Sequence, residues 1–350
     1  MRQPASRSRA ARKSPAVARV PIVQSAQARH DLLRMRRLTL LLGLSVFMIQ
    51  VCPAFADDRG WSYLIEKLVA DGVDRGHVNS VFQDRRVDAF DGLDFSPFPP
   101  REPRSRYRRF LRPASVAAAR RCRAQNAQAF ESAEREHGVS ANVLAAILYV
   151  ESGCGRNTGS SVIFHRLARL AMANEPSNVR RNLERWTDDG GYLDPATEAK
   201  IRARARYLEN TFYPEVRALF EVADRLGVAP LDIRGSGSGA FGYPQFLPTS
   251  YLTYGVDGDG DGRVSLYDTH DAAASCASYF VAHGWRPGLS KAQRRAAVWE
   301  YNRSEAYVDT VLTLATRISQ PGGRSPKKSV RRNKTRRQAE GSPHHRPHPG

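Results

Sequence analysis

The carboxyl group whose neighbours best suit it to donate a proton is that of Glu151. It ends an apolar stretch that runs from Val143 to Val150, and the segment Ser152 to Gly155 follows it. A carboxyl group among apolar neighbours is harder to ionise, so it can stay protonated near neutral pH and act as an acid. The alternative is a glutamate at a helix end that only faces solvent. The motifs elsewhere in the sequence help to decide between a proton-donating glutamate and a solvent-facing one.

A glycine-rich segment, residues 235–251, contains a formal GxGxxG between Gly237 and Gly242. A dinucleotide-binding turn needs a strand before it and a helix after it. Here Pro244 and Pro248 interrupt the stretch in which that helix would have to begin. Glycines interleaved with aromatic residues instead suit a groove wall that a sugar can approach closely. A plain surface loop is the alternative.

Three aspartates come next at regular spacing. Asp257, Asp259 and Asp261 stand at positions 1, 3 and 5 of a twelve-residue loop, with Gly262 at position 6 and Val264, which is apolar, at position 8. Oxygen ligands at these positions, with glycine at the sharp turn, are the pattern of an EF-hand calcium loop. The sequence therefore predicts a structural calcium ion and no organic cofactor.

The end of this loop allows two arrangements. Its twelfth position is Asp268, which is shorter than the usual glutamate. Asp271 could close the site instead, and Asp268 would then cap the helix that begins near His270. From the residues alone both arrangements stay open.

Helical patterns dominate the middle of the chain. Two short amphipathic segments lie between Trp61 and Asp84, and a stretch rich in Pro and Phe, residues 94–103, comes after them. Few alternating Val and Ile runs occur, so we predict a mainly α fold. Further helices are expected at about 115–137, 140–152, 162–173, 195–227, 270–283, 290–300 and 304–319.

The formal net charge of +19 comes from the two ends of the chain. Residues 1–34 carry eight basic side chains against one acidic, and residues 324–350 carry nine against one. With Arg36 and Arg37 also set aside, 35 basic and 33 acidic side chains remain. A nucleic-acid-binding protein carries its basic residues as a stripe on the fold itself, so we expect no nucleic-acid partner.

An export signal is expected at residues 35–56. It has a charged start at 35–37, an apolar run at 38–51 and an A-x-A cleavage site at 54–56. The apolar run is shorter than the about 20 residues that a membrane-spanning helix needs. We therefore predict cleavage after residue 56 and a periplasmic protein of the cell envelope.

Three further expectations concern the ends. Translation is expected to begin at Met35, so residues 1–34 are an untranslated or disordered extension. Lipid anchoring at Cys52 is not expected, because a lipobox has a small residue before the cysteine and Val51 stands there. Residues 321–350 are a low-complexity sequence of Lys, Arg, His and Pro, which predicts a disordered basic tail that contacts anionic envelope material.

Three cysteines remain after the signal, in a compartment where disulfides persist. Cys122 lies sixteen residues before Gly138, and Cys154 lies sixteen residues after it. If Gly138 separates two antiparallel helices, these cysteines face each other, which favours a bridge between them and leaves Cys276 free. Three buried free thiols are the alternative, because a sequence does not fix Cα separations.

With these elements assembled, the chain resembles the lytic murein transglycosylase B family from about Trp61 to Ile318. Several motifs in the same order are more specific than any one of them. The motifs are Tyr107-Arg108-Arg109-Phe110, Val150-Glu151-Ser152 with Gly155-Arg156, the segment Gly239 to Pro248, the calcium-type loop, His283-Gly284-Trp285 and Tyr301-Asn302-Arg303-Ser304.

The resemblance implies a lysozyme-like α+β catalytic domain at 115–320, after a helical lead-in and Pro-rich linker at 57–114. It places Glu151 as the acid and base. It implies sugar-binding roles for Tyr107, Ser236, Gln245, Tyr301 and Asn302. It also implies a calcium site whose ligands are Asp257, Asp259, Asp261, Arg263 and Asp271.

The chain departs from the family pattern in three places. Ser152 stands where the family usually has Thr, and Pro244 replaces a Gly. Residues 174–199 resemble an insertion. The insertion comes directly before the stretch from Arg202 to Tyr207, in which Arg204 is a candidate sugar contact.

The expected function is a peptidoglycan lytic transglycosylase. Ordinary glycosidases use two carboxylates, whereas the motifs here offer one. Glu151 would protonate the oxygen leaving C1 of N-acetylmuramic acid and then take the proton of its C6 hydroxyl, which gives a 1,6-anhydro end. The alternatives are a goose-type lysozyme-like hydrolase and a non-catalytic, calcium-dependent wall-binding module. The expected partner is the glycan strand, and the protein is expected to be a monomer.

Overall fold

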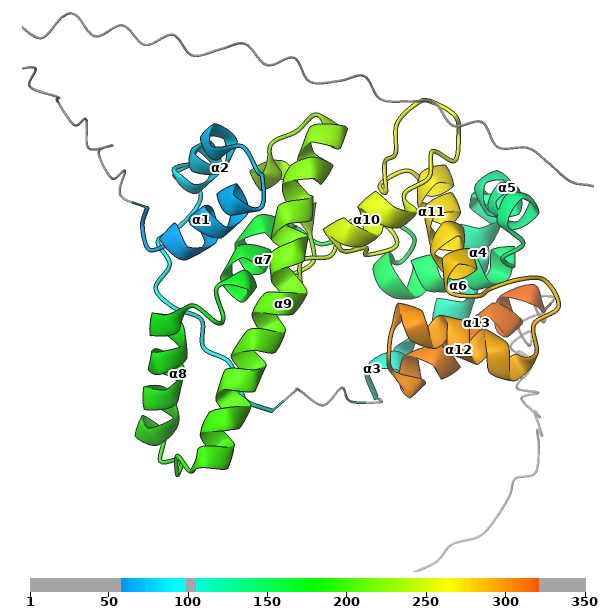
Figure 1. Ribbon diagram of the computed structural model, residues 1–350. Helices are drawn as coiled ribbons and strands as arrows, with labels where there is room; N and C mark the ends of the chain where they lie inside the picture. The colour runs from blue at the N-terminus through cyan, green and yellow to red at the C-terminus, as the bar shows by residue number, and fades with distance from the viewer. Residues whose placement is uncertain (1–57, 99–102, 104, 321–350) are drawn as a thin grey trace, which may run out of the picture. The chain divides into compact units, whose positions relative to one another are not determined.

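The computed structural model describes residues 58–98, 103 and 105–320. Within them lie thirteen α-helices, two short 3₁₀-helices and one two-stranded sheet, which confirms the predicted mainly α fold (Figure 1). Among these residues, no helix combines the length and the apolar character that crossing a membrane requires. The extension at 1–34, the signal at 35–56 and the tail at 321–350 lie outside the described residues.

The elements have the following bounds. The α-helices are α1 (Ser62–Ala70), α2 (Arg75–Phe82), α3 (Ser105–Arg108), α4 (Pro113–Gln125), α5 (Ala127–His137), α6 (Ala141–Ser152), α7 (Ile163–Ala171), α8 (Pro176–Asp188), α9 (Pro195–Leu226), α10 (Pro248–Tyr254), α11 (Thr269–Ala282), α12 (Lys291–Tyr301) and α13 (Glu305–Ser319). The 3₁₀-helices are η1 (Arg109–Leu111) and η2 (Pro230–Asp232), and the strands are β1 (Ser161–Val162) and β2 (Arg234–Gly235).

One hydrophobic core joins α1 and α2 to α7 and α9, and α7 lies beside α9 (Figure 1). The apolar residues of α7 recur at helical spacing, so one face of this helix is buried. Phe164 of α7 packs edge-on against Phe82 of α2 and against Phe220 of α9. The two lead-in helices are therefore part of this core.

The segment that resembles an insertion forms α8 and the start of α9. Asn178 and Asn182 on α8 are each 2% exposed. Asn178 Oδ1 accepts a hydrogen bond from the Leu93 amide at 2.7 Å, and Asn182 Nδ2 donates to the Leu93 carbonyl at 2.8 Å. These buried amides satisfy the backbone of the extended segment before the linker.

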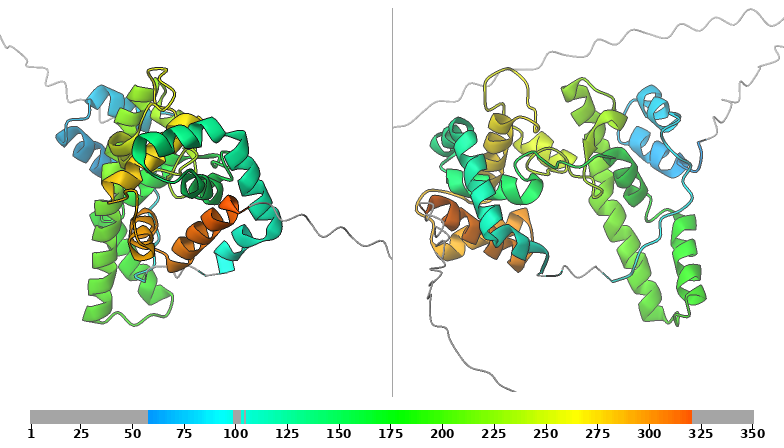
Figure 2. Two further views of the ribbon diagram at one scale, coloured as in Figure 1. Left: turned by 90° about the vertical axis from the view of Figure 1, so that its right-hand side faces the viewer. Right: turned by 180° about the vertical axis from the view of Figure 1, so that it is seen from behind.

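A second core surrounds α6, against which α4, α5, α11 and α13 pack (Figure 2). Every residue from Val143 to Val150 is buried. A helix that is apolar on all sides is expected to be enclosed in this way. The helix ends at Gly153, whose φ of 62° is the left-handed conformation that glycine adopts readily.

The structure pairs Cys122 with Cys154, which is the arrangement that their spacing favoured, and leaves Cys276 as a buried thiol. The helix expected at 115–137 is divided, however. Asn126 ends α4, and its side-chain amide donates to the Cys122 carbonyl at 2.9 Å. The bridge therefore joins the end of α4 to the turn after α6, rather than two sides of one helical hairpin.

The sequence did not indicate α10, because prolines punctuate this segment. Pro248 occupies the first turn of α10, where a missing amide hydrogen costs nothing. Buried Glu215 on α9 caps the helix: its carboxylate accepts hydrogen bonds from the Thr249 amide at 2.9 Å and from the Thr249 hydroxyl at 2.6 Å. This contact links residues far apart in the sequence.

Candidate active site and candidate metal site

A cleft of about 530 Å³ opens at the end of α6. Of the residues proposed from the sequence, Glu151 lines it together with Tyr107, Ser236, Gln245 and Asn302. The complete lining is Arg106, Tyr107, Arg109, Phe110, Val150, Glu151, Asn157, Gly159, Ser236, Ser238, Ala240, Gln245, Asn302 and Tyr307. Among these described residues, Glu151 is the only acid.

Tyr307 holds the carboxylate of Glu151. Glu151 lies in the last turn of α6 and is half-buried, whereas Tyr307 in the first turn of α13 is 1% exposed. The Tyr307 hydroxyl donates a hydrogen bond to Glu151 Oε1 at 2.6 Å. Burial, and then the negative charge of Glu151, raise the pKa of Tyr307 well above its usual value. Tyr307 therefore stays a neutral donor at any physiological pH.

Aromatic rings fix the position of Tyr307. Tyr107 meets its ring edge-on at a centroid distance of 5.8 Å, and Tyr301 lies parallel to it at 6.3 Å. Phe280 in turn lies parallel to Tyr301, with the two ring centroids 5.5 Å apart. Such packing restrains the ring and so directs its hydroxyl at Glu151.

Tyr301 is not among the residues that line the cleft. Its hydroxyl donates to the carbonyl oxygen of Pro244. The hydroxyl of Ser152, which is 1% exposed, donates to the preceding carbonyl, that of Tyr243, at 2.8 Å. Two hydroxyls thus hold consecutive carbonyls of the glycine-rich segment, which places Tyr301 behind the cleft wall rather than in it.

Two glycines let this wall approach the turn after α6. A Cβ atom at Gly155 would lie 2.3 Å from the ring of Tyr243, and one at Gly159 would lie 2.1 Å from the carbonyl oxygen of Gly235. These separations are far below van der Waals contact, so any larger residue would push the two loops apart. The glycines are therefore needed for the width of the cleft.

The polar residues of the wall are held by backbone contacts. Gln245 has a φ of 53°, unusual for a residue with a side chain, and its Nε2 donates to the carbonyls of Thr158 at 3.1 Å and Gly242 at 2.8 Å. Ser236 Oγ accepts from the Ala240 amide at 3.2 Å. The amide nitrogen of Gln245 is thus engaged in the wall, and its oxygen is the atom left for a ligand.

Arg204 lies elsewhere, on α9, where its guanidinium group stands over the ring of Tyr207 at 5.0 Å. It is not among the residues lining the cleft, which instead include Arg106 and Arg109. Sequence reasoning also missed Tyr307. A weak signal was present, since Tyr307 falls in the first turn of a predicted helix that follows the Tyr301-Asn302 motif.

Carboxylates also converge in the aspartate-rich loop. Oxygens of Asp257, Asp259 and Asp271 lie within 4.8 Å of one another. Asp271 is 2% exposed and accepts hydrogen bonds from the amides of Gly258 at 2.8 Å and Ser265 at 2.6 Å. Burial raises the pKa of Asp271, and the charge of Asp259 adds to this effect. A hard cation among these oxygens would offset both the burial of the Asp271 carboxylate and its repulsion by Asp259, so the donor set fits calcium.

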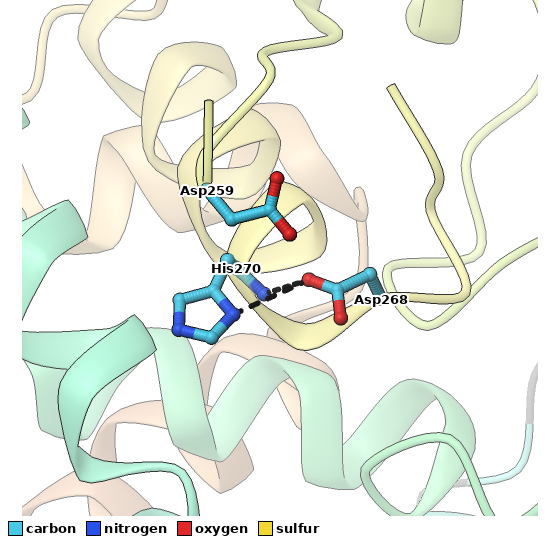
Figure 3. A group of neighbouring side chains, drawn as sticks. All are labelled: Asp259, Asp268 and His270. Carbon is cyan, nitrogen blue, oxygen red and sulfur yellow. Dashed lines mark hydrogen bonds and ion pairs between the residues drawn. The ribbon is translucent and has the colours of Figure 1, made fainter. Parts of the chain in front are cut away.

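Asp268 binds the start of α11 and is not in the group of Asp257, Asp259 and Asp271; Figure 3 shows it beside His270. Its Oδ1 accepts from the His270 amide at 2.6 Å and so caps α11, and it lies 3.4 Å from His270 Nδ1. Asp259 reaches this pair as well. Asp261 accepts from the Arg263 amide at 2.8 Å, within the loop. Asp268 therefore caps the helix, which was one of the two arrangements considered, while Asp271 stands with Asp257 and Asp259.

The loop also supports the cleft wall. The Tyr243 amide donates to the carbonyl of Leu266 at 2.7 Å, and a Cβ atom at Gly242 would lie 2.3 Å from Leu266 Cβ. The segment that ends the aspartate-rich loop is therefore in direct contact with the segment that bears Gln245.

Residues 56–296 match the model of the transglycosylase SLT domain family. The chain belongs to this family. This transglycosylase SLT domain is 34% identical over 164 residues to the membrane-bound lytic murein transglycosylase B of Escherichia coli K12, as its motifs indicated. That alignment covers 47% of this chain and 37% of the relative, so the chain spans well under half of the relative's length.

Solved structures share the fold of this SLT domain. The soluble lytic transglycosylase SltB1 of Pseudomonas aeruginosa matches with a TM-score of 0.56 and 22% identity, over 74% of this chain and 97% of that one. The Escherichia coli lytic transglycosylase Slt35 in complex with calcium matches with a TM-score of 0.54 and 23% identity, over 76% of this chain and 94% of that one.

Proposed function

We propose that this protein is a peptidoglycan lytic transglycosylase that cleaves the β-1,4 bond between N-acetylmuramic acid and N-acetylglucosamine and leaves a 1,6-anhydro end. The observation that carries the proposal is the single acid, Glu151, among the described residues of the cleft. Hydrolysis by the usual routes needs a second carboxylate as base or nucleophile. The family and the name of the Escherichia coli relative support the same reaction class.

In the first step, neutral Glu151 gives its proton to the glycosidic oxygen as the C1–O bond breaks. In the second, the C6 hydroxyl of the same sugar attacks C1, and Glu151 takes the hydroxyl proton. A C1–O6 bond replaces the broken bond, Glu151 returns to its starting form and no water is consumed. The hydrogen bond from Tyr307 to Glu151 Oε1 holds this carboxyl group at the cleft, where it can transfer the proton in both steps.

The remaining cleft residues bind and orient the sugar. Ser236, Gln245 and Asn302 supply polar groups at the lining, and Tyr107 supplies an aromatic face. We assign Tyr301 an indirect role through Pro244, and Arg204 remains a prediction with no contact to the cleft. Such neutral side chains suit a sugar, because a sugar hydroxyl can either donate a hydrogen bond to them or accept one from them.

Calcium, bound by Asp257, Asp259 and Asp271 with Asp261 and the backbone of Arg263, would stabilise the cleft wall. The contact between Tyr243 and Leu266 supports this role, because it couples the loop to the wall. The ion would supply no step of the reaction. The protein would act in the cell envelope, on glycan strands, after export by the signal at residues 35–56, and as a monomer.

Glu151→Gln tests the proposal, because glutamine keeps the volume and loses the transferable proton. Cleavage of purified peptidoglycan should fall by at least the 10² to 10⁴ that a general acid contributes, while the melting temperature and binding of short glycans stay near those of the wild type. Glu184→Gln, an exposed change on α8, is the matched control. Activity of Glu151→Gln within about tenfold of the wild type would show that another group is the general acid. Wall lysis that is unchanged in this variant would favour the non-catalytic wall-binding module.

A further inference from the structure

A second groove, of about 530 Å³, lies beside α12 and α13 and shares no lining residue with the cleft. Its volume falls in the range of roughly 300 to 1,000 Å³ that is typical of ligand sites. Lys291, Arg294 and Arg295 of α12 line one side of it, and Asp309 and Leu312 of α13 line another.

The groove carries surplus positive charge. Arg295 is neutralised by Glu305 and by Asp309, whose Oδ1 lies 2.5 Å from Arg295 Nη1. Lys291 and Arg294 are exposed, and within the described part of the chain neither is paired with a carboxylate. The only acid among the described lining residues is thus already engaged, and two cations remain for a ligand.

The rest of the lining is apolar or carries amides and hydroxyls. Trp285, which is 6% exposed, and Leu312 supply apolar surface, while Asn142 and Thr313 can each donate and accept hydrogen bonds. A phosphate polymer offers charge without apolar groups, so it would leave this surface uncovered. A peptide with acidic side chains matches both the cations and the apolar floor.

The groove and the cleft stand at opposite ends of shared helices. α6 has Asn142 of its first turn at the groove and Glu151 of its last turn at the cleft, and α12 runs from Lys291 at the groove toward Asn302 at the cleft. Eleven residues of helix span about 16 Å at 1.5 Å per residue. A ligand in the groove therefore leaves the cleft free for a glycan.

We propose that this groove is a second binding site, specific for a short acidic peptide segment. Charge complementarity selects the occupant: the basic tail of this chain, with nine basic residues against one acidic after residue 323, would be repelled by Lys291 and Arg294. The proposal concerns binding alone and does not depend on the reaction catalysed in the cleft.

The test measures fluorescence anisotropy of a labelled hexapeptide of alternating glutamate and leucine with the full-length protein. The wild type should bind it, and should bind the matched glutamine peptide at least tenfold more weakly. Added salt should weaken binding, because exposed charges are screened. The double variant Lys291→Glu and Arg294→Glu should lose at least tenfold in affinity while keeping its melting temperature and its turnover of short glycans.

Two controls locate the site. Lys200→Glu with Arg206→Glu makes the same change in net charge on exposed α9 positions and should leave peptide affinity within about twofold. Arg109→Glu, in the cleft, should do the same. The proposal is overturned if the wild type fails to bind the peptide or binds the glutamine form equally well. It is also overturned if Arg109→Glu abolishes binding while the groove variant retains it, or if inorganic polyphosphate binds the groove more tightly than the peptide.

Discussion

Replacing Tyr307 with phenylalanine should slow catalysis without unfolding the cleft. The ring stays between Tyr107 and Tyr301, so only the hydroxyl that donates to Glu151 Oε1 at 2.6 Å is lost. A hydrogen bond to a charged group is worth about 1.5 to 3 kcal/mol, which corresponds to a fall of about 10- to 150-fold in kcat. KM should change little, because no contact to the sugar is removed.

The pH profile gives a second signature. A donor to the carboxylate favours its ionised form, so removing it should move the high-pH limb of the rate profile, where the acid loses its proton, to higher pH. Steady-state rates on short glycans between pH 4 and 9 would measure both effects.

Tyr213→Phe is the matched control. The Tyr213 hydroxyl donates to Asp71 at 2.6 Å and has no place in the cleft, so this variant should lose stability without a change in the pH profile. The reasoning about Tyr307 is refuted if Tyr307→Phe keeps kcat within about twofold and leaves the limb unmoved. It is also refuted if both tyrosine variants lose activity in proportion to their stability.

Three further changes test other parts of the structure. Gly159→Ala should destabilise the protein by about 2 kcal/mol more than Gly190→Ala and should lower activity, because both glycines have positive φ but only Gly159 faces a carbonyl at 2.1 Å; equal urea midpoints would contradict the steric argument. Calcium at about 100 times its Kd should stabilise the wild type by about 2.7 kcal/mol, and Asp259→Ala should remove this increment; a melting curve that chelation leaves unmoved would reduce the loop to a turn. Truncation after Pro321 should weaken attachment to anionic envelope material at low salt and spare turnover of short glycans; a salt-independent loss of turnover would make the tail part of the enzyme.

The sequence was sufficient to predict the elements that depend on residues close to one another along the chain. The apolar run that ends at Glu151 predicted a helix at 140–152, and the structure has α6 at Ala141–Ser152. The spacing of Cys122 and Cys154 favoured the bridge that the structure shows over three free thiols, although the helix break at Asn126 was not predicted. A single asparagine is compatible with a helix interior, so its role as a terminator emerges only when its side chain takes the Cys122 carbonyl.

Elements stabilised from a distance were beyond sequence reasoning. The cap of α10 is Glu215, more than thirty residues before Thr249, and no spacing rule connects them. Tyr307 was missed for the same reason: its partner Glu151 lies 156 residues away. The position of Arg204 could not be derived either, because which face of the long helix α9 is buried depends on the helices that pack against it.

The measurement that tests the central claim most directly is the mass of the fragments that the wild-type protein releases from purified peptidoglycan. If Glu151, the only acid among the described residues of the cleft, acts on the C6 hydroxyl of the sugar, every new end is a 1,6-anhydro form, lighter by one water molecule than the hydrolysis product. Fragments with hydrated, reducible ends would contradict the account and show that water attacks C1.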